Sequence, residues 1–341
     1  MQIRTEDIDL KAADLRYVSD EEPGYRRLRW GQGFTYRDSD GETVNDDDLR
    51  SWFESLAIPP AWEDVWISPY RNGHLLATGR DSKGRKQYLY HPRWHELRNQ
   101  TKFHQLADFG KALPGLRQAV EADLRKRGIV RERVLALAVR LLEETLIRIG
   151  NDAYTQANTT YGLTTLRDKH VSISGQKITF EFVGKSGKEH QIELKDRQLA
   201  RIVKACRDIP GYDLFQYYDA DGQRQRITSG DVNTYIREIT GRDFTAKDFR
   251  TWGATTRALS ILAMCESAPC EDEVRTCVQQ VANELGNTVA VCRKYYIFPA
   301  LFDAFLDGEL PKLLKRVKPK NDLYPEEVAL IKLIEAQSKN N

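Results

Sequence analysis

Three basic residues lie at positions where their charge could bind an anion. Arg148 falls near the end of the strongest predicted helix, about 60° from the centre of its apolar stripe, so it must find an anion or be partly desolvated. Lys185 lies at the tip of a glycine-flanked hairpin, and Arg250 lies in the second turn of a capped helix, near a dipole end that suits phosphate. Taken singly, a salt bridge or a solvated turn explains each of them, so none alone decides the function.

Most of the chain after about Pro92 has helical periodicity. The strongest signal is Val130–Ile149, in which apolar residues recur at i, i+3, i+4 and i+7. Thr245 and Asp248 form a capping box that opens a helix running to about Met264. The other predicted helices are Lys102–Leu113, Leu116–Arg127, Glu271–Leu285 ended by Gly286, Val289–Tyr296, and Pro325 to about Gln337.

Strand signals occur in two places. Within the helical part, Val171–Ser174, Ile178–Val183 and His190–Leu194 alternate in polarity between glycine turns, which predicts a three-stranded antiparallel meander. The first ninety residues show short strands and turns, with one helix at Asp46–Leu56. The strands predicted there are Leu28–Thr35, Val65–Ser68, His74–Thr78 and Gln87–His91.

These patterns predict an α+β protein with two domains. Residues 1–91 form a small N-terminal α+β domain, and residues 92–341 form a larger, mainly helical domain with the inserted meander.

Composition excludes several classes of protein. Of the 341 residues, 40% are hydrophobic and 30% are charged, which is typical of a globular chain, and no apolar run reaches membrane-spanning length. Met1–Leu10 carries acids and lacks an apolar core, so we expect no signal peptide. Five cysteines without a CxxC pair favour reduced thiols. His91 and His95 have the spacing of a helical ligand pair, but Pro92 argues against a helix there, so we expect no metal.

Charge is unevenly distributed along the chain. Residues 1–70 hold 16 acidic against 8 basic residues, whereas residues 71–141 hold 16 basic against 6 acidic residues. The overall net charge of +2 therefore does not exclude a polyanionic partner, because binding depends on where the cations lie. A solvated basic face explains the same pattern equally well.

Several motifs, taken in order, carry a resemblance to a known family. They are LAIPPAWEDVWIS (Leu56–Ser68), GRDSKGRKQYLYH (Gly79–His91), LLEETLIRIGNDAYTQANTTYGLTTLR (Leu141–Arg167), FVGKSGKEH (Phe182–His190), FTAKDFRTWGAT (Phe244–Thr255) and VANELGNTVAVCRKYYI (Val281–Ile297). Together they resemble the type IB DNA topoisomerases of the small bacterial and poxviral kind, over about Leu28 to Pro299.

The resemblance implies a role for each matching residue. Arg148 and Arg250 would bind the scissile phosphate, Lys185 would be the general acid, Asn287 would contact a phosphate oxygen, and Tyr296 would be the nucleophile. Lys247 and Tyr154 match accessory DNA-binding positions near the phosphate. One departure is Val289, which follows Asn-Thr where the family often has proline.

These residue types suit metal-free strand cleavage. Two arginines can hold the nonbridging oxygens without losing their protons, and a phosphotyrosyl bond conserves the energy needed for resealing. The resemblance therefore implies relaxation of supercoiled DNA through a 3′-phosphotyrosyl intermediate, without ATP or a required metal. In the family, two lobes clamp duplex DNA. We accordingly expect double-stranded DNA as the partner, a monomer with no cofactor, and a cytoplasmic location, on the nucleoid if the source is bacterial.

Two other functions share parts of this pattern. A tyrosine site-specific recombinase uses the same Arg, Lys, Arg and Tyr set, but usually has histidine where this chain has Lys247, and usually has a helical N-terminal domain. A DNA-binding or scaffolding protein without catalysis would not need to retain the set. Locally, Tyr295 and Tyr296 could be core aromatics and Asn287 a helix cap, and helical periodicity does not choose between the two tyrosines.

Overall fold

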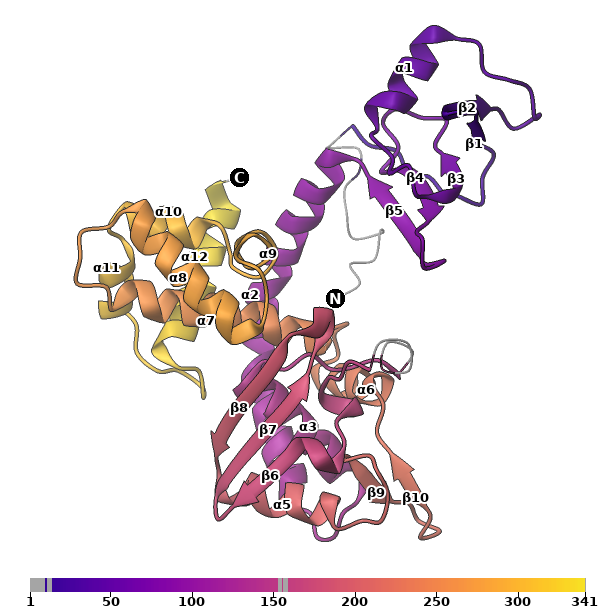
Figure 1. Cartoon of the computed structure of the whole chain (residues 1–341). Helices are drawn as coiled ribbons and strands as arrows, with labels where there is room; N and C mark the ends of the chain where they lie inside the picture. The colour runs from indigo at the N-terminus through magenta and orange to yellow at the C-terminus, as the bar shows by residue number, and fades with distance from the viewer. Residues whose placement is uncertain (1–9, 11–13, 153–154, 156–158, 341) are drawn as a thin grey trace. The chain divides into compact units, whose positions relative to one another are not determined.

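The computed structural model describes residues 10, 14–152, 155 and 159–340. Its contacts divide the chain into two compact units, residues 2–102 and Phe103–Asn341 with Met1. The division falls inside helix α2 (Pro92–Leu124), eleven residues beyond the boundary predicted from sequence, so the expected domain limits stay a prediction. Both units contain antiparallel sheets and helices, and the predicted α+β class is confirmed (Figure 1).

The N-terminal unit is built on one five-stranded antiparallel sheet with the order β2-β1-β3-β4-β5. Helix α1 (Asp47–Ser55) buries Phe53 against the sheet residues Tyr36, Val65 and Ile67. The strands are β1 (Tyr25–Trp30), β2 (Gly33–Arg37), β3 (Glu63–Ile67), β4 (Leu75–Arg80) and β5 (Lys86–Tyr90).

The single strand predicted at Leu28–Thr35 is wrong. The chain forms a hairpin there, in which Trp30 pairs with Gly33 and Leu28 pairs with Thr35. Gly31 has a φ of +57°, a conformation that glycine adopts without the steric cost paid by other residues. Gly31 and Gln32 therefore form a two-residue turn, which the aromatic-rich strand pattern did not predict.

Helix α2 overturns two expectations. Pro92 does not exclude a helix at His91–His95: it is the first residue of α2, where the missing N–H would have no partner in the helix anyway. The two helices predicted on either side of Pro114 are one helix. Leu113 and Leu116, which flank Pro114, are almost fully buried in the same core. This burial offsets the cost of an interior proline, about 3 kcal/mol.

The C-terminal unit consists of helices and two small sheets (Figure 1). The predicted meander is present as β6 (Val171–Ser174), β7 (Lys177–Val183) and β8 (Glu189–Lys195). Sequence analysis did not anticipate α5 (Arg197–Arg207), the hairpin of β9 (Gln216–Tyr218) and β10 (Arg224–Arg226), α6 (Ser229–Thr240), α10 (Ala300–Leu306) or α11 (Leu310–Lys315).

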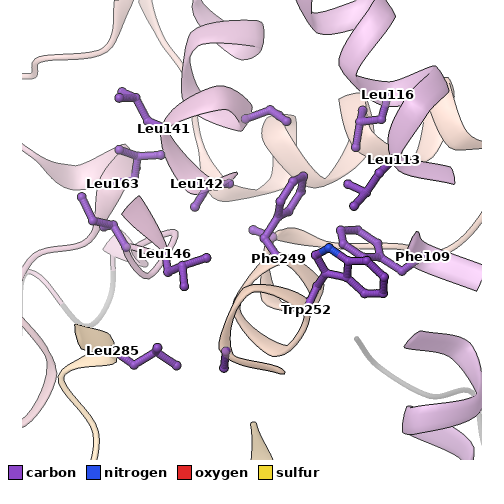
Figure 2. Packing of buried hydrophobic residues seen from close by; sticks show 14 of the residues in the cluster. Phe109, Leu113, Leu116, Leu141, Leu142, Leu146, Leu163, Phe249, Trp252 and Leu285 are labelled. Atoms are coloured by element: carbon purple, nitrogen blue, oxygen red, sulfur yellow. The ribbon is translucent and has the colours of Figure 1, made fainter. Parts of the chain in front are cut away.

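Helix α7 (Ala246–Ala263) is central to this unit and packs against α3 (Arg131–Thr145), α8 (Glu271–Leu285), α10, α11 and α12 (Pro325–Asn340). Figure 2 shows Phe249 and Trp252 of α7 beside Phe109 of α2. Gly110 makes this approach possible, because a Cβ atom there would lie 2.2 Å from the Trp252 ring. Interlocking aromatic packing of this kind holds α7 in a defined position.

The strongest predicted helix ends earlier than expected. Helix α3 stops at Thr145, and Leu146 adopts a left-handed conformation with φ 55°. The Leu146 side chain packs where α7 has Gly253, since a Cβ on Gly253 would lie 2.4 Å from it. The Leu146 carbonyl accepts a hydrogen bond from Arg250. These contacts with α7 end the helix, and Arg148 therefore lies in the loop that follows. None of the described helices is long and apolar enough to cross a membrane.

Candidate active site

One cavity of about 370 Å³ gathers five of the residues singled out in the sequence. They come from four separate parts of the C-terminal unit: the segment after α3, the β7–β8 hairpin, the first turns of α7, and the end of α9 (Val289–Tyr295). The five residues are Arg148, Lys185, Lys247, Arg250 and Tyr296.

Arg250 is deeply buried, with 4% of its surface exposed. Its guanidinium group donates hydrogen bonds to the carbonyls of Leu146 and Leu285, the latter at 2.9 Å. Burial, together with the charge of Arg148, lowers the pKa of Arg250 to about 10, although Tyr296 acts in the opposite direction. The group is therefore still a cation at neutral pH, held rigidly by two carbonyl oxygens.

Arg148 lies beside Arg250 and is also desolvated. Burial lowers its pKa, and Tyr296 partly offsets that shift. Its side-chain hydrogen bond goes to the neutral Oδ1 of Asn287. Among the residues that the structure describes, neither arginine has a carboxylate within ion-pairing distance. Two such cations cost free energy unless an anion compensates them, and phosphate matches their forked donors.

Asn287 lies behind Arg148 and is not part of the cavity lining. It is 7% exposed, and its Nδ2 is buried with no hydrogen-bond partner in the described part of the chain. Gly286, with φ 62°, is the residue that caps α8 in the left-handed conformation. The cap therefore does not account for the Asn287 side chain, which accepts a bond from Arg148 and keeps its Nδ2 donor group unused.

Lys185 is carried by a tight turn between β7 and β8. The Gly184 amide donates to the Lys188 carbonyl at 2.7 Å, and Ser186 and Gly187 have φ values of 65° and 72°. This closed turn projects the exposed Lys185 side chain into the lining of the cavity. A lysine at such a tip can reach a reacting group without displacing a packed core.

The two adjacent tyrosines differ in their placement. Tyr296 is the residue after α9, is partly buried, and lines the cavity. Its backbone is fixed by a 3.0 Å bond from its amide to the Cys292 carbonyl and by Thr255 Oγ1, which donates to its carbonyl at 3.1 Å. Tyr295 is 36% exposed and does not line the cavity. The predicted helix Val289–Tyr296 ends one residue early, and Tyr296, the residue that caps it, lines the cavity together with both arginines.

Two further predicted positions have different outcomes. Lys247 lines the cavity, whereas Tyr154 lies outside the described residues. The cavity also contains residues that sequence analysis did not select, among them Asn151 and Tyr161. The Leu141–Arg167 motif contains both residues, and its two glycines, Gly150 and Gly162, flank them. These glycines lie so close together that a Cβ on Gly162 would be 2.5 Å from the Gly150 amide nitrogen.

Metal-binding side chains do not gather in the part of the chain that is described: no group of three or more His, Cys, Asp or Glu residues is arranged to hold an ion there. The cationic side chains that line the cavity are Arg148, Lys185, Lys247 and Arg250.

Comparison with known proteins identifies the family. The family model of the eukaryotic DNA topoisomerase I catalytic core matches residues 91–305, and the model of the bacterial DNA topoisomerase IB N-terminal domain matches residues 33–81. DNA topoisomerase 1B of Acanthamoeba polyphaga mimivirus is 34% identical over 286 residues, covering 80% of this chain and 85% of the relative. DNA topoisomerase 1B of vaccinia virus (strain Copenhagen) is 24% identical over 254 residues, covering 72% and 76%.

A solved structure of the XerH site-specific recombinase bound to its difH substrate has a TM-score of 0.33 and 16% identity, over 64% of this chain and 56% of that chain. A similarity this low supports no argument about function. The family models and the mimiviral relative, in contrast, cover most of both units, and the motifs that they match carry the residues of the cavity. The chain therefore belongs to the type IB DNA topoisomerase family.

Proposed function

We propose that this protein relaxes supercoiled duplex DNA by cutting one strand with Tyr296, allowing the cut strand to rotate, and resealing it. Family membership supports DNA as the substrate. The observation that carries the chemistry is the pair of desolvated guanidinium groups, Arg148 and Arg250, facing a cavity that Tyr296 also lines. The pair is suited to a phosphodiester, and the tyrosine supplies the nucleophile.

In the cleavage step, Tyr296 Oη attacks the scissile phosphorus. The new bond joins phosphorus to Oη, and the bond between phosphorus and the 5′-oxygen breaks, leaving a 3′-phosphotyrosyl link. The phenol loses its proton and the leaving 5′-oxygen gains one, so the step needs no net proton. Because one phosphoester replaces another, the reverse reaction reseals the strand without ATP.

Arg148 and Arg250 would stabilise the charge that develops on the nonbridging oxygens. Both groups are preorganised, Arg250 by two backbone carbonyls and Arg148 by Asn287, so little reorganisation is needed when the phosphate binds. The unused Nδ2 donor of Asn287 would gain a partner from a phosphate oxygen. The arginines supply the positive charge that a metal would otherwise provide, so we expect no metal requirement.

Lys185 would protonate the leaving 5′-oxygen. An alkoxide is a poor leaving group, and a positioned acid lowers the barrier to its departure. Lys247, an exposed residue that lines the same cavity, would contact the DNA backbone near the scissile phosphate. The basic stretch within residues 71–141 would supply further phosphate contacts and make binding dependent on salt. We also propose that the protein acts as a monomer in the cytoplasm, on the nucleoid if the source is bacterial.

The test is relaxation of supercoiled plasmid in EDTA without ATP. We expect both positively and negatively supercoiled plasmids to be relaxed, and a covalent protein–DNA complex to accumulate on a suicide substrate. A strict need for Mg²⁺ or ATP would contradict the mechanism. Exchange of strands between two marked sites, without relaxation of a single plasmid, would instead identify a recombinase.

A further inference from the structure

The turn after α8, residues 285–287, makes hydrogen bonds to several parts of the proposed active site. Leu285 accepts a hydrogen bond from Arg250 through its carbonyl, and the Asn287 side chain accepts one from Arg148. The Asn287 carbonyl in turn accepts a bond from Lys188 Nζ at 2.9 Å. Lys188 belongs to the β7–β8 turn that carries Lys185. The turn at 285–287 thus binds both arginines and the hairpin at once.

His190, the second residue of β8, makes a second connection between the same two segments. A Cβ atom on Gly184 would lie 2.7 Å from the His190 ring, and one on Gly286 would lie 2.4 Å from it. The ring therefore touches two backbones at positions where no side chain other than hydrogen fits. It also stacks on Phe182, with 5.0 Å between ring centroids and an interplanar angle of 14°.

Each of the two glycines directly precedes a residue of the proposed active site. Gly184 directly precedes Lys185, and Gly286 directly precedes Asn287. A ring packed against both glycines fixes the spacing between the backbone that carries the proposed general acid and the backbone that holds Arg148. The tip of this hairpin is otherwise held by pairing between β7 and β8 and by the Tyr161 amide, which donates to the Val183 carbonyl at 2.8 Å.

We propose that His190 and Lys188 are positioning residues, which dock the Lys185 hairpin against the turn at 285–287 and so place the proton donor relative to the phosphate-binding arginines. The inference rests on the proposed function and extends it to two residues outside the reacting set. A misplacement of about 1 Å can cost about 10²-fold in rate, so a loosened hairpin should impair proton donation more than DNA binding.

A steric test uses Gly184→Ala, His190→Ala and the double variant. Gly184 has φ −94°, which alanine adopts without strain, so the added methyl group acts only by pushing against the His190 ring. We expect Gly184→Ala to slow cleavage of ordinary DNA by about 10-fold or more. In the His190→Ala background the ring is gone, and adding Gly184→Ala should cause no further loss. Independent, multiplying defects would overturn the docking role.

A chemical test asks which part of the site is disturbed. On DNA with a 5′-bridging sulfur the leaving group needs no proton, so the defects of Gly184→Ala and Lys188→Met should largely disappear there, while DNA affinity stays within about twofold of wild type. A defect that persists on this substrate would mean that these residues act on the phosphate-binding arginines and not on the hairpin. Lys188→Met changes an exposed side chain, so it gives an answer even if the His190 variants unfold.

Lys195→Met is the matched control, since Lys195 is an exposed lysine at the opposite end of β8. It should cleave both substrates at the wild-type rate, and an equal defect in Lys195→Met and Lys188→Met would overturn the specific role of Lys188. The outcomes also separate this inference from the proposed function. If the wild type forms no covalent complex on either substrate, the proposed function fails. If the wild type cleaves and the Gly184, Lys188 and His190 variants cleave equally well, only the docking role fails.

Discussion

The guanidinium carbon of Arg250 lies 5.4 Å from the centre of the Tyr296 ring. A cation at this position favours negative charge on the phenol oxygen as the nucleophile forms, and the same cation faces the cavity where a phosphate would bind. Tyr295 lies outside the cavity lining. The proposed nucleophile and the proposed phosphate-binding group thus lie together in one cavity, and only the second tyrosine of the pair lines it.

The first prediction separates the two tyrosines. Tyr296→Phe keeps the ring and removes the hydroxyl, so the fold should survive while covalent attachment to DNA disappears. Tyr295→Phe should keep most of the activity, because its ring does not line the cavity. The measurement is trapping on a suicide DNA substrate, followed by mapping of the DNA-linked peptide. A DNA adduct at Tyr295, or a covalent complex formed by Tyr296→Phe, would show that the assignment is wrong.

The second prediction concerns the acid. Lys185→Ala should slow cleavage by about 10²–10⁴-fold, the range expected when a positioned proton donor is lost. A substrate with a 5′-bridging sulfur should restore the rate, since the thiolate leaves without a proton. Single-turnover cleavage of matched oxygen and sulfur substrates provides the comparison. If both substrates show equal defects, Lys185 positions DNA and donates no proton.

Elements with an uninterrupted local pattern could be predicted from the sequence. Helix α7 and the β6–β7–β8 meander follow their periodicity and their turn residues closely. The end of α3 could not be predicted, because Gly253 and Arg250, more than a hundred residues away, decide where Leu146 leaves the helix. Long-range contacts of this kind leave no trace in a local window.

The site divides in the same way. The residue types of Arg148, Lys185, Arg250 and Tyr296 were recognisable through the family motifs, but their geometry was not. The bond from Arg148 to Asn287 joins residues 139 positions apart, so no local spacing encodes it. His190 was not singled out at all. The sequence contains a glycine directly before Lys185 and another directly before Asn287. These two glycines point to His190 only once the structure shows that both lie against its ring.

The third prediction concerns the C-terminal helix. Glu327 is 4% exposed, and its carboxylate accepts two hydrogen bonds from Arg117 of α2, one from Trp252 Nε1 of α7, and one from the Tyr324 amide. Arg117 also pairs with Glu143 of α3. Glu327→Gln should lower the free energy of unfolding by about 3 kcal/mol, because the partly buried Arg117 cation loses its bidentate carboxylate partner.

Denaturant unfolding of Glu327→Gln should be compared with Glu326→Gln. Glu326 is the neighbouring residue, is partly exposed, and makes no ion pair or hydrogen bond among the described residues. Its substitution should change stability by less than about 0.5 kcal/mol. Equal effects of the two substitutions would mean that the network around Arg117 adds nothing to the attachment of α12.

The last prediction concerns pH and His190. Burial, followed by the charges of Arg148, Arg250 and Lys188, lowers the pKa of His190 from 6.5 to about 4. Between these values the unfolded chain binds a proton that the folded chain does not. Protonation therefore favours the unfolded chain, so the free energy of unfolding falls as pH drops from about 6.5 toward 4. The contribution is at most about 3 kcal/mol, since each pKa unit corresponds to about 1.4 kcal/mol and the ring is partly exposed.

His190→Gln removes this titration but leaves His74 and His170, whose pKa values burial also lowers. The wild type should therefore lose more stability than His190→Gln between pH 7 and pH 4.5, measured by urea unfolding at each pH. A difference between the two proteins that stays constant over this range would mean that His190 is not held neutral beside the arginines.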